Sequence, residues 1–199
     1  MSISDTPHLN ILMMQYITRK GTFDAAHRVL HQTSACRNLH GHLYQYELTF
    51  KHDHIEDIGY AIDFKEIKRI VGQFIEDRFD HGFIANPTDS VFLEACDQVH
   101  SKVWTVTLNG KSGFCNPTAE NISKEIFLLS EKLLTTKNLK IYSVRLYETP
   151  NCFVDCTSNS ITYDERVNFL TNRKEELEKY KNEKGTVIYD NRLINAPVG

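Results

Sequence analysis

Two histidines stand two residues apart at His40 and His42, in the tripeptide HGH. On a β-strand, residues at this spacing point to the same face, so both imidazoles can reach one ion. His27 closes an earlier apolar segment, FDAAHR, and becomes a third donor if the two segments are neighbouring strands. Three neutral imidazoles with a vacant fourth position describe a catalytic rather than a structural zinc site. The alternative is a chance pair among nine histidines.

A single cysteine, Cys36, lies four residues before His40, in a polar loop beside Arg37. A bound cation and a guanidinium both favour a thiolate, which can act as a base or a nucleophile. Most free cysteines are small buried hydrophobic residues, and we interpret Cys96 and Cys115 in that way. The polar neighbours of Cys36 favour a chemical role for this thiol.

Further groups with acid/base or binding capacity follow later in the chain. Asp80 and His81 are adjacent, and a carboxylate beside an imidazole can form an oriented acid/base pair. Glu148 shares a strand face with Val144 and Leu146, where a carboxylate is costly unless it meets hydrogen-bond donors. A ligand with amide-like N–H and amino groups would supply such donors.

The elements that position these residues are strands and two helices. Residues Met14–His27 and His40–Lys51 are rich in Tyr, Phe, Ile and Thr, which predicts two strands joined by a polar loop. Apolar residues at helical spacing predict a helix that ends near Phe79, and NPTAEN opens a second one. Lys140–Thr149 returns to strand-like alternation. This order predicts an α+β domain whose helices cover one face of an antiparallel sheet.

Length and charge set limits on the class of protein. The 199 residues suit one domain with a tail, and we expect a domain over 1–163 followed by a charged helical extension over 164–199. A net charge of -3 with scattered basic residues argues against nucleic acid as a partner. The five cysteines form no paired motif, and no apolar run is long enough for a membrane span. We therefore expect a cytoplasmic protein.

The motifs together resemble the family of 6-pyruvoyl- and 6-carboxy-tetrahydropterin synthases. The resemblance rests on FDAAHR, CRNLHGH, DFKEIK, FDH, NPTAEN and YET, and it covers roughly residues 16–153. It implies the tunnelling fold, or T-fold, in which an antiparallel sheet with two helices on one face oligomerises into a barrel. A homo-oligomer, trimer or hexamer, with active sites at subunit contacts and a small pterin substrate is therefore expected.

The resemblance also implies roles for the individual residues. The three histidines would bind Zn²⁺, Cys36 would abstract a proton, and Asp80 with His81 would form the second acid/base pair. Glu148 would anchor the pterin ring. In relatives NPTAEN lines the pterin pocket, which implicates Thr118 and Glu120, although a helix cap is an equally physical use of that threonine.

The spacing of three residues between Cys36 and His40 resembles the carboxy-forming enzymes of the queuosine and 7-deazaguanine (preQ0) pathway. The implied activity is a zinc-dependent 6-carboxy-5,6,7,8-tetrahydropterin synthase, a carbon–carbon lyase that releases acetaldehyde and triphosphate from 7,8-dihydroneopterin triphosphate. Alternatives are a 6-pyruvoyl-tetrahydropterin synthase, a non-catalytic pterin-binding module, and a structural metal site in a protein whose function lies in the tail. The stretch from His81 to Asn116 and the charged tail are longer than in compact relatives.

Overall fold

A long β-hairpin forms the spine of the structure. The computed structural model describes residues 14–53, 59–108, 115–136 and 138–185. Strand β1 (Gln15–His27) pairs antiparallel with β2 (His40–His52) along its whole length, so that His27 lies directly opposite His40. The predicted strands are thus confirmed, and their register brings the ends that carry histidines together.

The hairpin lies inside a six-stranded sheet of order β4-β3-β1-β2-β5-β6. Strands β5 (Leu139–Thr149) and β6 (Cys152–Thr157) continue the antiparallel pattern beside β2. Strands β3 (Gly82–Ala85) and β4 (Val103–Thr105) run parallel to β1, so the sheet is mixed rather than wholly antiparallel. The difference arises because the chain reaches β3 through a helical crossover, which returns it in the direction of β1.

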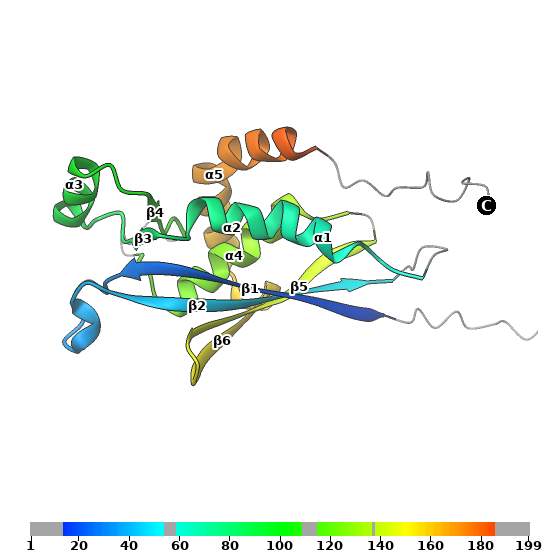
Figure 1. Ribbon diagram of the computed structural model, residues 1–199, viewed down its shortest axis with the longest axis horizontal. Coiled ribbons are helices and arrows are strands. Elements are labelled where there is room, and N and C mark those ends of the chain that lie inside the picture. The colour runs from blue at the N-terminus through cyan, green and yellow to red at the C-terminus, as the bar shows by residue number, and fades with distance from the viewer. Residues whose placement is uncertain (1–13, 54–58, 109–114, 137, 186–199) are drawn as a thin grey trace, which may run out of the picture.

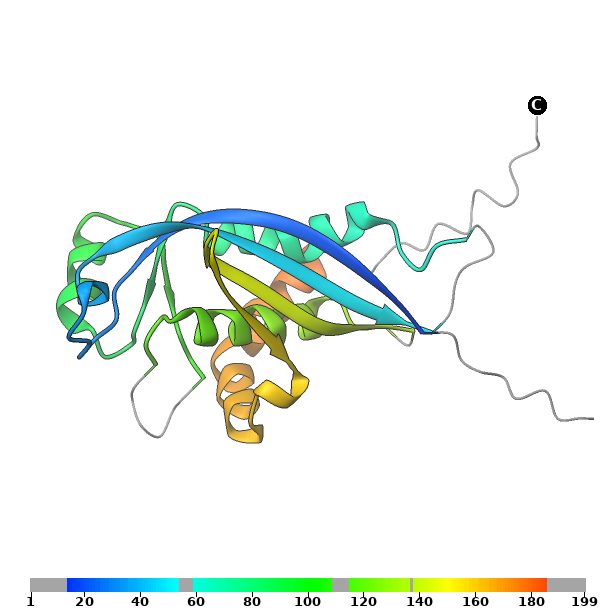
Figure 2. The ribbon, with the colours of Figure 1, turned by 90° about the horizontal axis from the view of Figure 1, so that it is seen from below.

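Two helical segments cover one face of this curled sheet, as expected (Figure 2). The first runs through α1 (Phe64–Ile67), a π-turn (Lys68–Gly72) and α2 (Gln73–Arg78), and it ends where the apolar spacing predicts. The second is α4 (Ala119–Leu133). Thr118 caps α4, since its side chain accepts a hydrogen bond from the Asn121 N–H. The fold is the expected α+β arrangement.

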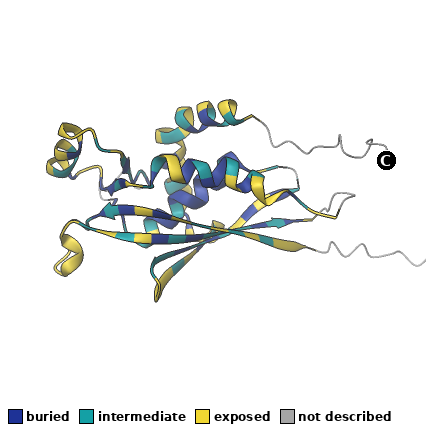
Figure 3. Cartoon of the chain, viewed as in Figure 1, coloured by how far each residue is buried: buried dark blue, intermediate teal, exposed yellow. Residues whose placement is uncertain are grey.

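The core lies between the sheet and these helices. Alternate residues of β2, from Tyr44 to Phe50, are buried and meet the apolar faces of α2 and α4. Figure 3 shows the resulting pattern, with buried positions lining the space between the two layers. The histidines at the end of the hairpin continue the same buried face, which explains why their rings are partly removed from solvent.

Two further helices lie outside this two-layer unit. Helix α3 (Ser90–Gln98) belongs to the stretch between β3 and β4, and α5 (Tyr163–Lys184) packs on α4, on the side away from the sheet (Figure 1). Phe169, Leu177 and Tyr180 are the buried residues of α5. Residues 186–199 of the expected extension lie outside the described residues. No helix in the described ranges has the length and apolar character that a membrane crossing would need.

Candidate metal centre

Three imidazoles meet where the hairpin reaches its connecting loop. One ring nitrogen from each of His27, His40 and His42 lies within 4.8 Å of the other two. The ring centroids of His27 and His40 are 4.5 Å apart, and those of His40 and His42 are 4.9 Å apart. Because His27 faces His40 across the ladder and His42 follows two residues later, the strand register alone assembles the cluster.

The ring of His27 is held so that its free nitrogen faces the cluster. Its side chain is 1% exposed, and its Nδ1 lies 2.6 Å from the carbonyl oxygen of Pro117, to which it donates a hydrogen bond. The opposite nitrogen, Nε2, is buried and has no hydrogen-bond partner among the described residues. His40 likewise directs Nδ1 to the Asn38 carbonyl, at 2.8 Å. The orphaned lone pair of His27, fixed in this way, suits a metal ion.

The protonation states also favour a metal. Burial, with smaller contributions from the nearby His40 and His42, lowers the pKa of His27 to about 4 against the opposing hydrogen bond to Pro117. Burial also lowers the pKa of His42, against the attraction of Glu148. Both rings are therefore held in the neutral form that binds metals at neutral pH.

A carboxylate and a phenol complete the immediate surroundings. Glu148 Oε1 lies 3.6 Å from His27 Nε2 and 4.0 Å from His42 Nε2. The ring of Tyr44 stands edge-on to both histidines, and its buried hydroxyl has no hydrogen-bond partner in the described part of the chain. Burial raises the pKa of Tyr44, and the charges of Glu148 and Cys36 act in the same direction.

Cys36 lies in the loop that joins β1 to β2, between His27 and His40. It is exposed, and it belongs to a short 3-10 turn (Ala35–Arg37). Its carbonyl oxygen accepts a 2.9 Å hydrogen bond from the N–H of Val29. The loop thus closes back on the end of β1, next to His27.

The side chains of Asp80 and His81 are hydrogen-bonded to each other. His81 Nδ1 lies 2.6 Å from Asp80 Oδ2, while the other oxygen of Asp80 accepts a hydrogen bond from the N–H of Asp24 at 2.8 Å. Burial would raise the pKa of Asp80, but the hydrogen bonds from Asp24 and His81 and the charge of Lys102 outweigh it and lower the pKa. His81 has a φ of 54°, which is uncommon for a residue other than glycine.

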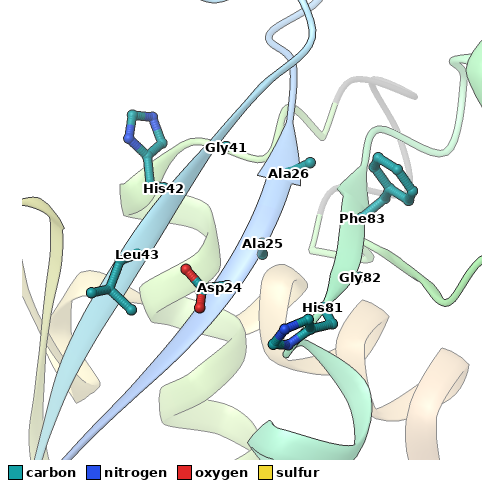
Figure 4. A pocket seen from close by; sticks show the side chains of 9 residues that line it. All are labelled: Asp24, Ala25, Ala26, Gly41, His42, Leu43, His81, Gly82 and Phe83. Atoms are coloured by element: carbon teal, nitrogen blue, oxygen red, sulfur yellow. The ribbon is translucent and has the colours of Figure 1, made fainter.

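The pair is not bonded to the histidine cluster within the described ranges of this chain, although His42 and His81 both line one open depression. Figure 4 shows this cavity, of about 400 Å³, with His42 on one side, His81 on the other and Asp24 between them. Strands β1 and β2 and the start of β3 form its walls. Of the histidine cluster and the Asp80–His81 pair, His42 and His81 are the members that line this depression.

The two residues of NPTAEN have different surroundings. Thr118 is partly buried at the N-cap of α4, directly after the proline that holds His27. Glu120 lies exposed in the first turn of α4. The structure shows a capping role for Thr118 and does not bring Glu120 into contact with the histidines.

Sequence reasoning missed two contributors. The carbonyl of Pro117 fixes His27, but a main-chain atom leaves no residue-type signal in a sequence. Tyr44 lies on the same strand face as His42, two residues further along, so alternation alone could have placed it at the site.

Comparison with solved structures defines the class of fold. The chain superposes on Caenorhabditis elegans 6-pyruvoyl tetrahydropterin synthase with a TM-score of 0.52 and 18% identity, over 73% of this chain and 96% of that one. The curled sheet with helices on one face is thus the T-fold.

Sequence comparison then gives the family. The family model described as 6-pyruvoyl tetrahydropterin synthase matches residues 16–159. A 6-carboxy-5,6,7,8-tetrahydropterin synthase of Rickettsia conorii is 35% identical over 142 residues, which is 69% of this chain and 96% of the relative. The enzyme of the same name from Haemophilus influenzae is 32% identical over 145 residues, 70% of this chain and 96% of the relative. The chain belongs to the 6-pyruvoyl tetrahydropterin synthase family.

Proposed function

We propose that the protein is a zinc-dependent 6-carboxy-5,6,7,8-tetrahydropterin synthase. Its substrate would be 7,8-dihydroneopterin triphosphate, and its products 6-carboxy-5,6,7,8-tetrahydropterin, acetaldehyde and triphosphate, in queuosine and 7-deazaguanine (preQ0) biosynthesis. The observation that carries the proposal is the buried, unpartnered Nε2 of His27 within a cluster of three imidazoles. The names of the relatives support the choice of the carboxy product.

The donor set fits zinc. Three neutral imidazoles are a common ligand set of catalytic zinc, and the hydrogen bonds to Pro117 and Asn38 supply the partners that orient such ligands. When bound, the ion would supply Lewis acidity that makes the C–H bonds of the substrate side chain more acidic. His27, His40 and His42 would hold it.

Residues of this chain would then bind the substrate and move its protons. Cys36, as a thiolate, would accept the proton from the side-chain carbon. His81, oriented by its hydrogen bond to Asp80, would exchange a proton elsewhere on the side chain. The carboxylate of Glu148 would accept hydrogen bonds from the pterin ring and hold it beside the metal ligands. Thr118 and Glu120 are proposed as weaker substrate contacts at the start of α4.

A homo-oligomer, trimer or hexamer, would complete the site. The edges of the sheet offer unpaired backbone groups to another copy. A second copy would bring its Asp80 and His81 toward the histidines of the first copy. Within the described part of one chain, no bond joins that pair to the three histidines. The five cysteines are all free thiols, so a reducing compartment such as the cytoplasm would keep Cys36 available.

A comparison of two exposed cysteines tests this proposal. Cys36→Ala should lower acetaldehyde release from 7,8-dihydroneopterin triphosphate by at least about 100-fold, the usual contribution of one proton-transfer group. Cys152→Ala, which removes the other exposed thiol, should leave the rate unchanged. Equal rates in wild type and Cys36→Ala at full zinc occupancy would refute the role of Cys36.

A further inference from the structure

The side-chain amide of Asn116 binds the main chain of Leu30 on both of its hydrogen-bonding groups. Leu30 N–H donates to Asn116 Oδ1 and Asn116 Nδ2 donates to the Leu30 carbonyl, both at 3.0 Å. Asn116 is buried and lies 86 residues from Leu30 in sequence. The amide therefore substitutes for a neighbouring strand at a point where β1 has already ended.

The position of this contact matters because Leu30 opens the loop that carries Cys36. The preceding residue, Val29, donates its N–H to the carbonyl of Cys36, and the residue after Asn116 is Pro117, which holds the ring of His27. One dipeptide thus fixes a metal ligand and the base of the Cys36 loop at the same time. Within residues 29–38 the backbone also forms three short turns, with N–H groups of Gln32, Arg37 and Asn38 donating to Val29, Ser34 and Ala35.

A second layer of polar groups supports Asn116. Asn86 Nδ2 donates to Asn116 Oδ1 at 3.0 Å, and Asn86 Oδ1 accepts from the N–H and hydroxyl of Thr88. Next to it, Asp89 receives a two-pronged hydrogen bond from Arg28, the residue that follows His27. Asp89 is 4% exposed and also caps α3. The long stretch after His81 therefore reaches the site. Its residues 86–89 form hydrogen bonds to Arg28 and Asn116, which hold the segment between His27 and Leu30 in place.

These contacts form a satisfied buried network, and such networks favour one backbone conformation over its alternatives. Both oxygen lone pairs of the Asn116 amide are used, and its nitrogen donates to a carbonyl that would otherwise lack a partner strand. Loss of the amide would leave the N–H and C=O of Leu30 without these bonds, at a cost that favours local opening of the loop.

We propose that Asn116 is a positioning residue that fixes the Cys36 loop relative to His27, with the Arg28–Asp89 pair as its outer support. The effect on turnover rests on the proposed function of Cys36, whereas the effect on the loop does not. None of Asn116, Arg28 and Asp89 is assigned contact with the substrate.

Hydrogen exchange in the full-length, zinc-loaded protein tests the proposal. Asn116→Ala should accelerate exchange of the Val29 and Leu30 amides by about tenfold or more, because two hydrogen bonds to the loop are lost. Asp89→Asn should accelerate the same amides to a smaller extent. Unchanged exchange at Val29 and Leu30 in both variants would overturn the proposal, and Asp89→Asn decides the matter if Asn116→Ala does not fold.

Two control variants separate positioning from general loss of stability. Ser130→Ala removes a buried hydrogen bond within α4, and Asp155→Asn breaks an Arg–Asp pair of the same two-pronged geometry on the exposed sheet. Both should leave exchange at Val29 and Leu30 as in wild type. Equal acceleration in these controls would show that the loop responds to global stability and would contradict the proposal.

Kinetics distinguish failure of this inference from failure of the proposed function. Asn116→Ala should lower kcat while zinc content and KM stay within about twofold of wild type. If wild type itself does not release acetaldehyde, the proposed function fails, yet the exchange measurement still decides whether Asn116 holds the loop. If zinc content instead falls in proportion to activity, Asn116 supports only His27 and not the Cys36 loop, which would contradict the proposal.

Discussion

His27 is the residue on which the account of the site rests most heavily. Its ring has one nitrogen committed to the Pro117 carbonyl and one buried without a partner among the described residues. A buried acceptor without a hydrogen bond costs roughly 1–3 kcal/mol, a cost that a bound ion would remove. The same burial keeps the ring neutral, so the geometry and the protonation state of His27 both favour metal binding.

This burial predicts how the metal-free protein responds to acid. The unfolded chain protonates His27 near its ordinary pKa of 6.5, whereas the folded chain resists protonation until about pH 4. Because the folded-state pKa is depressed, the unfolded state gains protons first as the pH falls. The free energy of unfolding should therefore decrease from about pH 6.5 to about pH 4, by at most about 3 kcal/mol from this residue.

Urea unfolding of the metal-free protein at a series of pH values measures this effect. His27→Gln removes the titrating group and should flatten the curve within that window. If wild type and His27→Gln lose stability equally between these two pH values, His27 is not held neutral by the fold.

At the scale of elements, the β1–β2 hairpin assembles the histidine cluster, whereas α5 packs against the rest of the fold. The register of β1 and β2 places the three histidines together without help from other strands. Helix α5 is highly charged, yet Phe169, Leu177 and Tyr180 are buried against the rest of the chain. Arg173 adds a guanidinium 3.7 Å from the ring centroid of Trp104 and a hydrogen bond to the Thr105 carbonyl. The helix is thus packed into the fold.

Two leucines of α5 test this packing. Leu177 is fully buried and Leu170 is 39% exposed on the same helix. Leu177→Ala should lower the free energy of unfolding by about 2–5 kcal/mol, since it removes a core side chain. Leu170→Ala should change it by no more than about 0.5 kcal/mol. Thermal and urea unfolding measure both, and a neutral Leu177→Ala would show that α5 does not hold the core.

At the scale of the whole molecule, we propose that residues 1–163 carry the site and that 164–199 are an extension. The packing of α5 affects how this division is tested. Truncation after Tyr163 would expose the residues that Phe169 and Leu177 cover, so loss of activity in a truncated chain would not assign function to the tail. The substitutions in α5 are a better test of the alternative that the function lies in the tail, because they leave the chain at full length.

Much of this architecture could be predicted from the sequence, because strands and amphipathic helices leave periodic patterns. Alternation from His42 to Phe50 gives the face of β2, and HGH with FDAAHR gives the histidine cluster. The apolar run KVWTVTL indicates a strand where β4 lies, but β3 is too short to show a period and neither segment reveals its direction, so the parallel pairing could not be predicted. The links of Asn116 to Leu30 and of Pro117 to His27 span many residues, and one sequence holds no record of such pairings.

Mass spectrometry of the product formed from 7,8-dihydroneopterin triphosphate tests the central claim most directly. The zinc-loaded protein should yield a 6-carboxytetrahydropterin, with acetaldehyde and triphosphate in equal amounts. A clean 6-pyruvoyl product, or no turnover by protein that holds one zinc per chain, would contradict it.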